Sequence, residues 1–229
     1  MRLFGVPVRF QFSSLFLFWI FGMYGWNLTG SLFGVAGCIA IFLISLLTHE
    51  FMHVFVARRY GIPCHGITVM MLGAGAMLKD MGDRPGKMFA IAAAGPATSF
   101  VLAGAFLGIG AFGPFSGTAA TVLAFGVMLN LILGIFNTIP MYPLDGGRLA
   151  HAVAWKLVGD EQRGRVIVVW LSRALIVGLL VWSAYTVFTG SLHAFDLLWR
   201  GMIALFLWSA GTLELRRGAN ESSQDSDNQ

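Results

Sequence analysis

Charged residues are scarce in this chain of 229 residues: Asp, Glu, Lys and Arg make up 11% of it, against about a quarter of a typical soluble domain. So few charges cannot cover a surface that faces water, and 57% of the residues are hydrophobic. The excess of apolar residues therefore predicts a membrane protein, whose partner on most of its surface is the lipid bilayer.

Cysteine is also nearly absent, with Cys38 in an apolar run and Cys64 in a polar connection. Two such cysteines exclude a disulfide-stabilised scaffold. The first apolar run is not followed by a small-residue cleavage site, so we expect it to be a retained span and not a signal peptide. The formal net charge of +4 does not indicate nucleic-acid binding, because the basic residues lie in short clusters between apolar runs, as in membrane proteins.

Six apolar segments are long enough to cross the hydrocarbon core, which takes about 20 residues of helix. They are residues 10–28, 32–56, 88–112, 118–136, 166–188 and 192–213. Asp196 and Arg200 interrupt the sixth segment. The sequence thus predicts an all-α polytopic membrane protein with about six transmembrane helices, which form one domain over residues 1–218.

The positions of the basic residues predict the orientation of these helices. Lys and Arg gather before the first segment, between the second and third, between the fourth and fifth, and after the sixth. The three opposite connections, near Asn27, Pro114 and Gly190, contain none, and only Arg173 and Arg200 depart from the pattern. By the positive-inside rule, we expect a multi-pass protein of the cell membrane with both termini in the cytoplasm.

Three further segments have distinct patterns. Residues 62–81 alternate β-branched, glycine and apolar residues, which predicts a small membrane-associated β-hairpin between the second and third spans. Residues 147–158 are typical of an amphipathic helix at the cytoplasmic surface. Residues 219–229 are polar and poor in apolar residues, so we expect a disordered cytoplasmic tail.

The second apolar segment contains His49-Glu50-Phe51-Met52-His53. Positions i and i+4 share one face of a helix, so His49 and His53 can both direct an imidazole at one metal ion. Glu50 lies one step round the helix, where it can act as a general base on a water molecule at that metal. Three ionisable residues within a span are costly to bury, and this cost favours a metal site over coincidence.

A catalytic zinc site needs a third protein ligand. The candidates are His65, His151, His193, Asp80, Asp83, Asp145 and Asp196. The second and fourth spans cross in the same direction, so their C-terminal ends lie at the same depth, and Asp145 is the acid that follows the fourth span. We therefore predict that Asp145 is the third ligand, although it could instead cap the helix that follows. Surface or outer-shell positions are expected for His65 and His151.

The segment before Asp145 contains Pro140 and Pro143, which interrupt a helix. Broken helix at membrane depth is tolerated where it lines a cavity or is buried in protein, and a hydrolytic site needs such a cavity. Asn137 offers an amide that could hold a substrate backbone or stabilise an oxyanion. A hydrogen bond between helices is an equally good interpretation of Asn137.

Together these residues resemble the site-2 protease family of intramembrane zinc metalloproteases. The resemblance rests on His49, Glu50 and His53, followed by Asn137, Pro140, Asp145 and Gly146 at the family's spacing. Ala94-Gly95-Pro96 looks like the family's Gly-Pro motif, and Gly73-Ala74-Gly75 like the turn of its hairpin. Where the family usually has Asn, this chain has Ser99, which we expect to weaken a polar contact and to leave the metal site intact.

The resemblance implies one zinc ion per chain and regulated intramembrane proteolysis of a partner's transmembrane helix. It implies a compact form of the family, without PDZ or CBS domain. Two other functions remain open: a non-proteolytic membrane metal-binding protein, and an inactive protease-like scaffold. Intact Glu50 argues against a scaffold, and a single ligand cluster argues against a metal carrier, which needs ligands along a path. The sequence does not indicate the substrate, the oligomeric state, or the roles of Ser99, His65 and His151.

Overall fold

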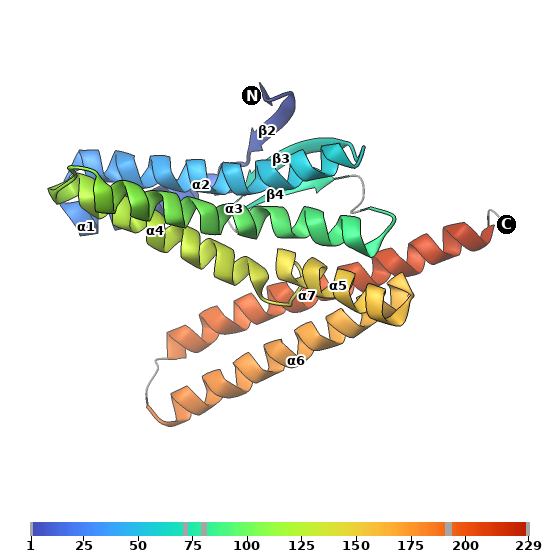
Figure 1. Ribbon diagram of the computed structural model, residues 1–229. Coiled ribbons are helices and arrows are strands. Elements are labelled where there is room, and N and C mark those ends of the chain that lie inside the picture. Colours follow the sequence, from blue (N-terminus) through green and yellow to red (C-terminus); the bar gives the residue numbers. More distant parts are fainter. Residues whose placement is uncertain (1, 71–72, 79–81, 191–193, 228–229) are drawn as a thin grey trace. The chain divides into compact units, whose positions relative to one another are not determined.

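A computed structural model describes all residues except 1, 71–72, 79–81, 191–193 and 228–229 (Figure 1). The chain divides into two compact units, Met1–Asn137 and Thr138–Gln229. The first contains β1 (Arg2–Leu3), β2 (Val6–Phe10), the 3-10 turn η1 (Phe12–Ser14), α1 (Leu15–Thr29), α2 (Leu32–Arg59), β3 (Cys64–Met70), β4 (Gly73–Leu78), α3 (Pro85–Phe112) and α4 (Gly117–Thr138). The second contains α5 (Asp145–Val158), α6 (Glu161–Phe188) and α7 (Ala194–Asp227).

In the part of the chain that the structure describes, α2, α3, α4 and α6 are long and apolar enough to cross a membrane. They correspond to four of the six predicted spans, so the chain is mostly helical and multi-pass. The first predicted span corresponds to α1, which is only 15 residues long, and the sixth to α7. The crossing of the membrane by these two helices stays a prediction.

Helix α2 is the central element of the first unit and packs against α1, α3 and β4. Its buried residues recur every three or four positions and form one face of the helix. The N-terminal half of this face is mainly apolar, as at Cys38, Ile41 and Phe42, and its C-terminal half carries the polar residues His49, Glu50 and His53. Between the two halves, Ser45 accepts a hydrogen bond from the Asn130 amide of α4 at 2.8 Å.

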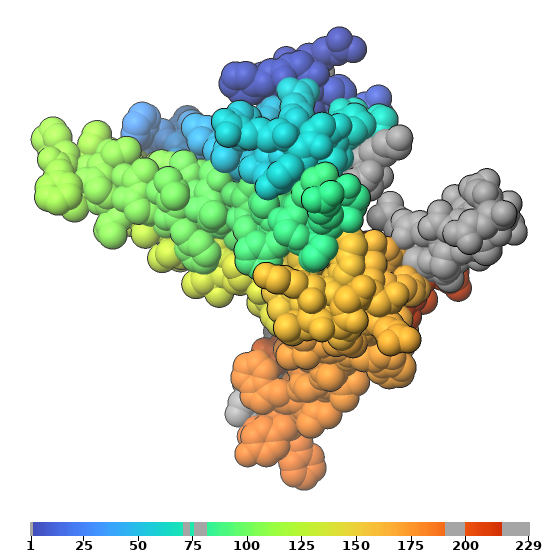
Figure 2. All heavy atoms as spheres, turned by 45° about the vertical axis from the view of Figure 1, so that its right-hand side comes forward, coloured from blue at the N-terminus to red at the C-terminus, as the bar shows by residue number. Residues whose placement is uncertain are grey.

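The predicted hairpin is present, but it belongs to a larger sheet. Strands β3 and β4 are antiparallel, β2 adds to β3 in parallel, and β1 completes the order β1-β2-β3-β4. Figure 2 shows the N-terminal segment in dark blue lying against the cyan part of the chain. Val6 and Val8 of β2 are buried against Val54 and Ile67. The sequence analysis began the first span at Phe10, whereas the structure ends β2 there and begins α1 at Leu15.

In the second unit, α6 packs against both α5 and α7, and Figure 1 shows α6 and α7 side by side. The predicted amphipathic helix is α5, which begins two residues earlier than expected and ends at Gly159 in the left-handed conformation. Asp160 caps α6 by accepting a hydrogen bond from the Arg163 amide. Arg173, one of the two basic residues outside the charge pattern, stacks on Trp170 and on Trp208 of α7.

Helix α7 extends to Asp227, so most of the predicted disordered tail, residues 219–229, is helical in the structure. The predicted division at residue 218 also differs from the division into two units after Asn137. The functional domain boundaries of the chain stay predictions.

Candidate metal centre

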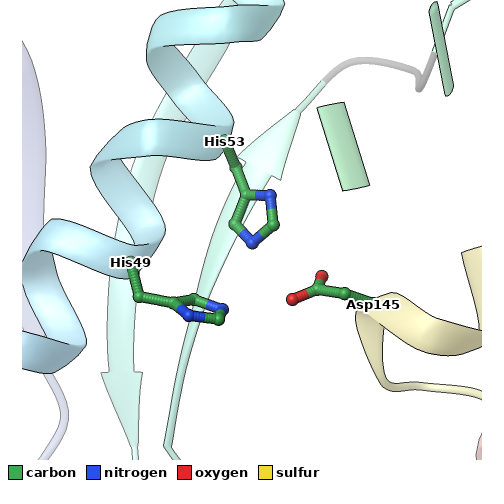
Figure 3. Close-up of side chains that lie close together, drawn as sticks. All are labelled: His49, His53 and Asp145. Carbon is green, nitrogen blue, oxygen red and sulfur yellow. The ribbon is translucent and has the colours of Figure 1, made fainter. Parts of the chain in front are cut away.

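The first unit contributes His49, Glu50 and His53 from α2. All three are buried, with 2%, 7% and 5% of their surface exposed. Their spacing on a regular helix directs the two histidines to the same side, as Figure 3 shows. The centres of the two imidazole rings are 5.0 Å apart. The local pattern in the sequence therefore translates directly into two adjacent imidazoles.

Helix α3 holds both imidazoles through their Nδ1 atoms. Nδ1 of His53 lies 2.7 Å from the backbone carbonyl oxygen of Ile91. Since a carbonyl can only accept, Nδ1 carries the hydrogen, and Nε2 of His53 keeps its lone pair. Nδ1 of His49 lies 2.9 Å from the hydroxyl of Ser99. Partners of this kind fix the ring and the tautomer of metal-binding histidines.

Gly95 of α3 lies beside the two Nε2 atoms. A Cβ at this position would be 2.6 Å from Nε2 of His49 and would collide with Nε2 of His53. The missing side chain of Gly95 therefore keeps a methyl group away from both Nε2 atoms. Two buried imidazoles with their Nδ1 atoms held and their Nε2 atoms beside Gly95 are a chemically suitable half of a zinc site.

The second unit contributes Asp145, which is buried and is the first residue of α5. The residue at the N-cap position is Leu144, so the alternative that Asp145 caps the helix is wrong. Glycines at the next two positions allow a close approach of the preceding segment. A Cβ at Gly146 would overlap the backbone of Thr138 and Ile139, and one at Gly147 would lie 2.7 Å from the Met141 carbonyl carbon.

The three ligands predicted from the sequence, His49, His53 and Asp145, are all among the described residues, and Figure 3 labels their side chains. Each of the three side chains is buried and offers one ligand atom. Two nitrogens and one carboxylate oxygen match the ligand types of catalytic zinc sites, which keep a fourth position open.

Asn137 makes a hydrogen bond within its own helix, and its proposed role toward a substrate stays a prediction. Its amide nitrogen donates to the Leu133 carbonyl of its own helix at 3.0 Å. The amide has a second N–H and an acceptor oxygen, so binding a substrate does not require that this bond be released.

The other candidates for the third ligand fall into two groups. His65 is exposed on β3, as expected for a surface residue, and Asp83 is an exposed acid that pairs with Lys87 at 2.7 Å. His193, Asp80 and the side chain of Asp196 lie outside the described residues.

Sequence reasoning missed the roles of Ser99 and His151. Ser99 is fully buried and contacts His49 itself, so the polar contact that we expected to be weakened is made to a candidate ligand. A serine within an apolar helix next to the Gly-Pro pair was the available signal. His151 is buried and not at the surface; it contacts Tyr142 at 2.8 Å and the Glu161 carbonyl at 2.9 Å.

Comparisons with known proteins agree with this geometry. The sequence profile of peptidase family M50 matches residues 37–119 and 113–180. Rip3 of Mycobacterium tuberculosis, provisionally assigned as a zinc metalloprotease, is 32% identical over 232 residues, 94% of this chain and 58% of Rip3. Zinc metalloprotease MJ0392 of Methanocaldococcus jannaschii is 33% identical over 159 residues, 69% of this chain and 45% of MJ0392.

The fold also has a counterpart among solved structures. The site-2 protease from Methanocaldococcus jannaschii superposes with a TM-score of 0.65 and covers 94% of this chain and 93% of the other, at 23% sequence identity. At this identity the likeness concerns the fold alone. The chain spans 58% or less of the length of the curated relatives described above.

Proposed function

The chain belongs to peptidase family M50, and from this membership we propose that it is an intramembrane zinc metalloendopeptidase. It hydrolyses a peptide bond in or near the transmembrane helix of a membrane-protein substrate. The observation that carries the proposal is the pair of buried imidazoles whose Nδ1 atoms are held by Ser99 and Ile91 and whose Nε2 atoms lie beside Gly95.

In this proposal His49, His53 and Asp145 hold one zinc ion per chain. When bound, zinc lowers the pKa of water toward neutrality and polarises the scissile carbonyl. The proposed ligands fit this metal, since each is buried and the set combines imidazole and carboxylate groups. The two histidines are held by α3 in orientations that need no rearrangement of their Nδ1 contacts.

Glu50 is the proposed general base. It accepts a proton from the attacking water and passes this proton to the leaving amine. Its place on α2, one residue after His49, gives it access to the same region without making it one of the three ligands. Asn137 is the proposed group that binds the substrate backbone or the oxyanion, because its amide has a second N–H besides the one that donates to the Leu133 carbonyl.

Strand β4 supports the proposed type of substrate. It is the last strand in the sheet order, so within the described residues it has a neighbour on one side only. An edge strand presents unpaired backbone groups that an extended peptide can join as an added strand. A peptide bond must leave its helix before hydrolysis, because the helix engages its carbonyl. Pairing with β4 would satisfy backbone groups that unwinding leaves open in lipid.

Replacing the base tests the proposal. Glu50→Gln keeps the shape of the side chain and removes its ability to accept a proton. In the full-length protein in proteoliposomes, with a single-span model substrate, we expect bound zinc to be retained and cleavage to fall about 10²–10⁴-fold. Asp83→Asn, which alters an exposed acid, is the control and should cleave like the parent. Substantial cleavage by Glu50→Gln would exclude Glu50 as the base.

Metal analysis tests the ligands in the same preparations. His49→Ala, His53→Ala and Asp145→Ala should each lower the zinc content from one ion per chain. Parental zinc affinity in Asp145→Ala would remove Asp145 from the set. Full zinc content in the parent without zinc-dependent cleavage of any single-span substrate would favour a non-proteolytic metal protein or an inactive scaffold.

A further inference from the structure

A buried chain of hydrogen bonds lies next to Asp145 in the second unit. Tyr142, three residues before Asp145, is 2% exposed, and His151 of α5 is 3% exposed. The Tyr142 hydroxyl lies 2.8 Å from Nδ1 of His151, and Nε2 of His151 lies 2.9 Å from the Glu161 carbonyl oxygen at the start of α6. Nothing in the proposed hydrolysis uses either side chain.

The direction of each hydrogen bond follows from the acceptor at the end of the chain. A backbone carbonyl cannot donate, so Nε2 of His151 carries the hydrogen and Nδ1 must accept from the Tyr142 hydroxyl. Burial lowers the pKa of His151 and raises the pKa of Tyr142. Both shifts favour the neutral imidazole and the protonated phenol that this arrangement requires.

The backbone of Tyr142 is held as well as its side chain. Its amide donates to the Ser172 hydroxyl of α6 at 3.2 Å, and this hydroxyl donates to the Val168 carbonyl at 2.8 Å. The side chain also packs against the buried residues Val168 and Val169. Tyr142 is thus fixed to α5 through His151 and to α6 through Ser172.

The segment fixed at Tyr142 leads directly into Asp145. On the other side of Asp145, Gly147 lies so close to this segment that a Cβ would be 2.7 Å from the Tyr142 backbone nitrogen. The short stretch from Tyr142 to Gly147 therefore forms a tight turn with both ends anchored. These anchors at Tyr142 and Gly147 restrict the backbone that carries Asp145.

We propose that Tyr142, held by His151 and Ser172, positions Asp145 for metal binding. The proposal rests on the proposed role of Asp145 as a ligand. Tyr142, His151 and Ser172 touch neither metal nor substrate, so they act through the backbone on the carboxylate. Removing a group that orients a metal ligand typically lowers metal affinity about 10–100-fold. We expect about tenfold here, because Tyr142 is three residues from Asp145 and acts on it only through the backbone.

Two pairs of conservative variants test the proposal in the full-length protein, with zinc affinity measured by competition with a chelator. Ser172→Ala removes the acceptor of the Tyr142 amide. Its control is Ser183→Ala, a second buried serine of α6 that also donates to the carbonyl four residues earlier, at 2.7 Å. Tyr142→Phe removes the hydroxyl, and its control is Tyr185→Phe at an exposed tyrosine of α6.

We expect Ser172→Ala and Tyr142→Phe to weaken zinc binding about tenfold and both controls to bind zinc like the parent. Equal losses in variants and controls would show a general effect of destabilising the second unit and would overturn the proposal. Parental affinity in Tyr142→Phe and Ser172→Ala would overturn it too. Asp145→Ala separates this failure from that of the proposed function: if it also binds zinc normally, Asp145 is not a ligand at all.

His151 allows a finer test, because two amides each replace one ring nitrogen. In His151→Asn the amide oxygen takes the place of Nδ1 and can accept from Tyr142. In His151→Gln the amide nitrogen takes the place of Nε2 and can donate to the Glu161 carbonyl. Positioning through Tyr142 predicts that His151→Asn retains more zinc affinity than His151→Gln. The reverse order would show that the bond to Glu161, and not the bond to Tyr142, is what matters.

Discussion

At the scale of single residues, the absence of a side chain at Gly95 keeps the space beside the two imidazoles open. Its neighbours are the Nε2 atoms of His49 and His53, and the added volume of a methyl group would occupy the place next to both. Helix propensity favours alanine over glycine by about 1 kcal/mol. Glycine at this position is therefore explained by the site and not by the helix.

Gly95→Ala should strongly weaken zinc binding without unfolding the protein. The Cβ would force both imidazoles away from their positions, so we expect zinc affinity to fall at least about 100-fold, the upper end of outer-shell effects. Gly104→Ala is the matched control, since a Cβ at that position of the same helix meets no atom within 4 Å. Chelator competition and thermal unfolding measure the two effects, and zinc affinity at the parental level in Gly95→Ala would contradict this account.

The sequence predicted those residues of the candidate site whose proximity follows from the geometry of a single helix. His49, Glu50 and His53 follow from the spacing of one helix turn. Ser99 could not be predicted as the partner of His49, because the contact joins residues 50 positions apart and depends on how α3 packs against α2. The same holds for His151, whose burial arises from packing of α5 against α6.

At the scale of elements, the apolar segments predicted the helices because length and composition alone define a span. The sequence of strand β2 does not have a length or composition that would predict a strand. It has five residues, in which the buried Val6 and Val8 alternate with Pro7 and Arg9. Its partner in the sheet is β3, and both α1 and α2 lie between the two strands in the chain. Pairing over such a distance cannot be inferred from a short alternating pattern.

The substrate's own helix provides a prediction at this scale. If the scissile segment must unwind before it joins β4, cleavage should depend on helix stability near the cytoplasmic end of the substrate span. Replacing Gly, Pro, Asn or Ser in that region by Leu raises helix propensity. We expect slower cleavage with unchanged association, as measured by initial rates and by co-purification with Glu50→Gln. Equal cleavage of an uninterrupted poly-Leu span would show that unwinding is not limiting.

At the scale of the whole molecule, the sheet bears on the number of spans. β2 precedes α1, β3 follows α2, and the two strands are hydrogen-bonded to each other. They must therefore lie on the same side of the membrane. Helix α2 has 28 residues and is about 42 Å long, enough to cross the bilayer. If α2 crosses the bilayer, the chain must also cross it in the other direction between β2 and β3, and we expect α1 to make this crossing despite its 15 residues.

Topology reporters test this crossing and the predicted orientation. Reporters inserted between α1 and α2 near Gly30, and between α6 and α7 near Gly190, should report the outside. Those inserted near Asp83 and fused after Gln229 should report the cytoplasm. A cytoplasmic signal near Gly30 would contradict the crossing of α1, and an outer signal after Gln229 would contradict a sixth span.

The sequence could predict neither the two compact units nor their boundary at Asn137. The boundary follows the fourth apolar segment directly and has no linker composition. The basic clusters predict an orientation for each helix but do not determine which helices pack together. That grouping arises from contacts such as those of α2 with α3, and of α6 with α5 and α7.

The parallel pairing of β2 with β3 also sets an order of events during synthesis. Val8 pairs with Ile67, so β2 emerges from the ribosome roughly 60 residues before its partner, about 3 to 12 s at 5–20 residues per second. With the predicted topology, α1 and α2 must both enter the membrane before the two strands can pair. A chain in which only one of them has inserted holds the two strands on opposite sides of the bilayer and cannot close the sheet. Insertion of only one of the two helices is therefore incompatible with closure of the sheet.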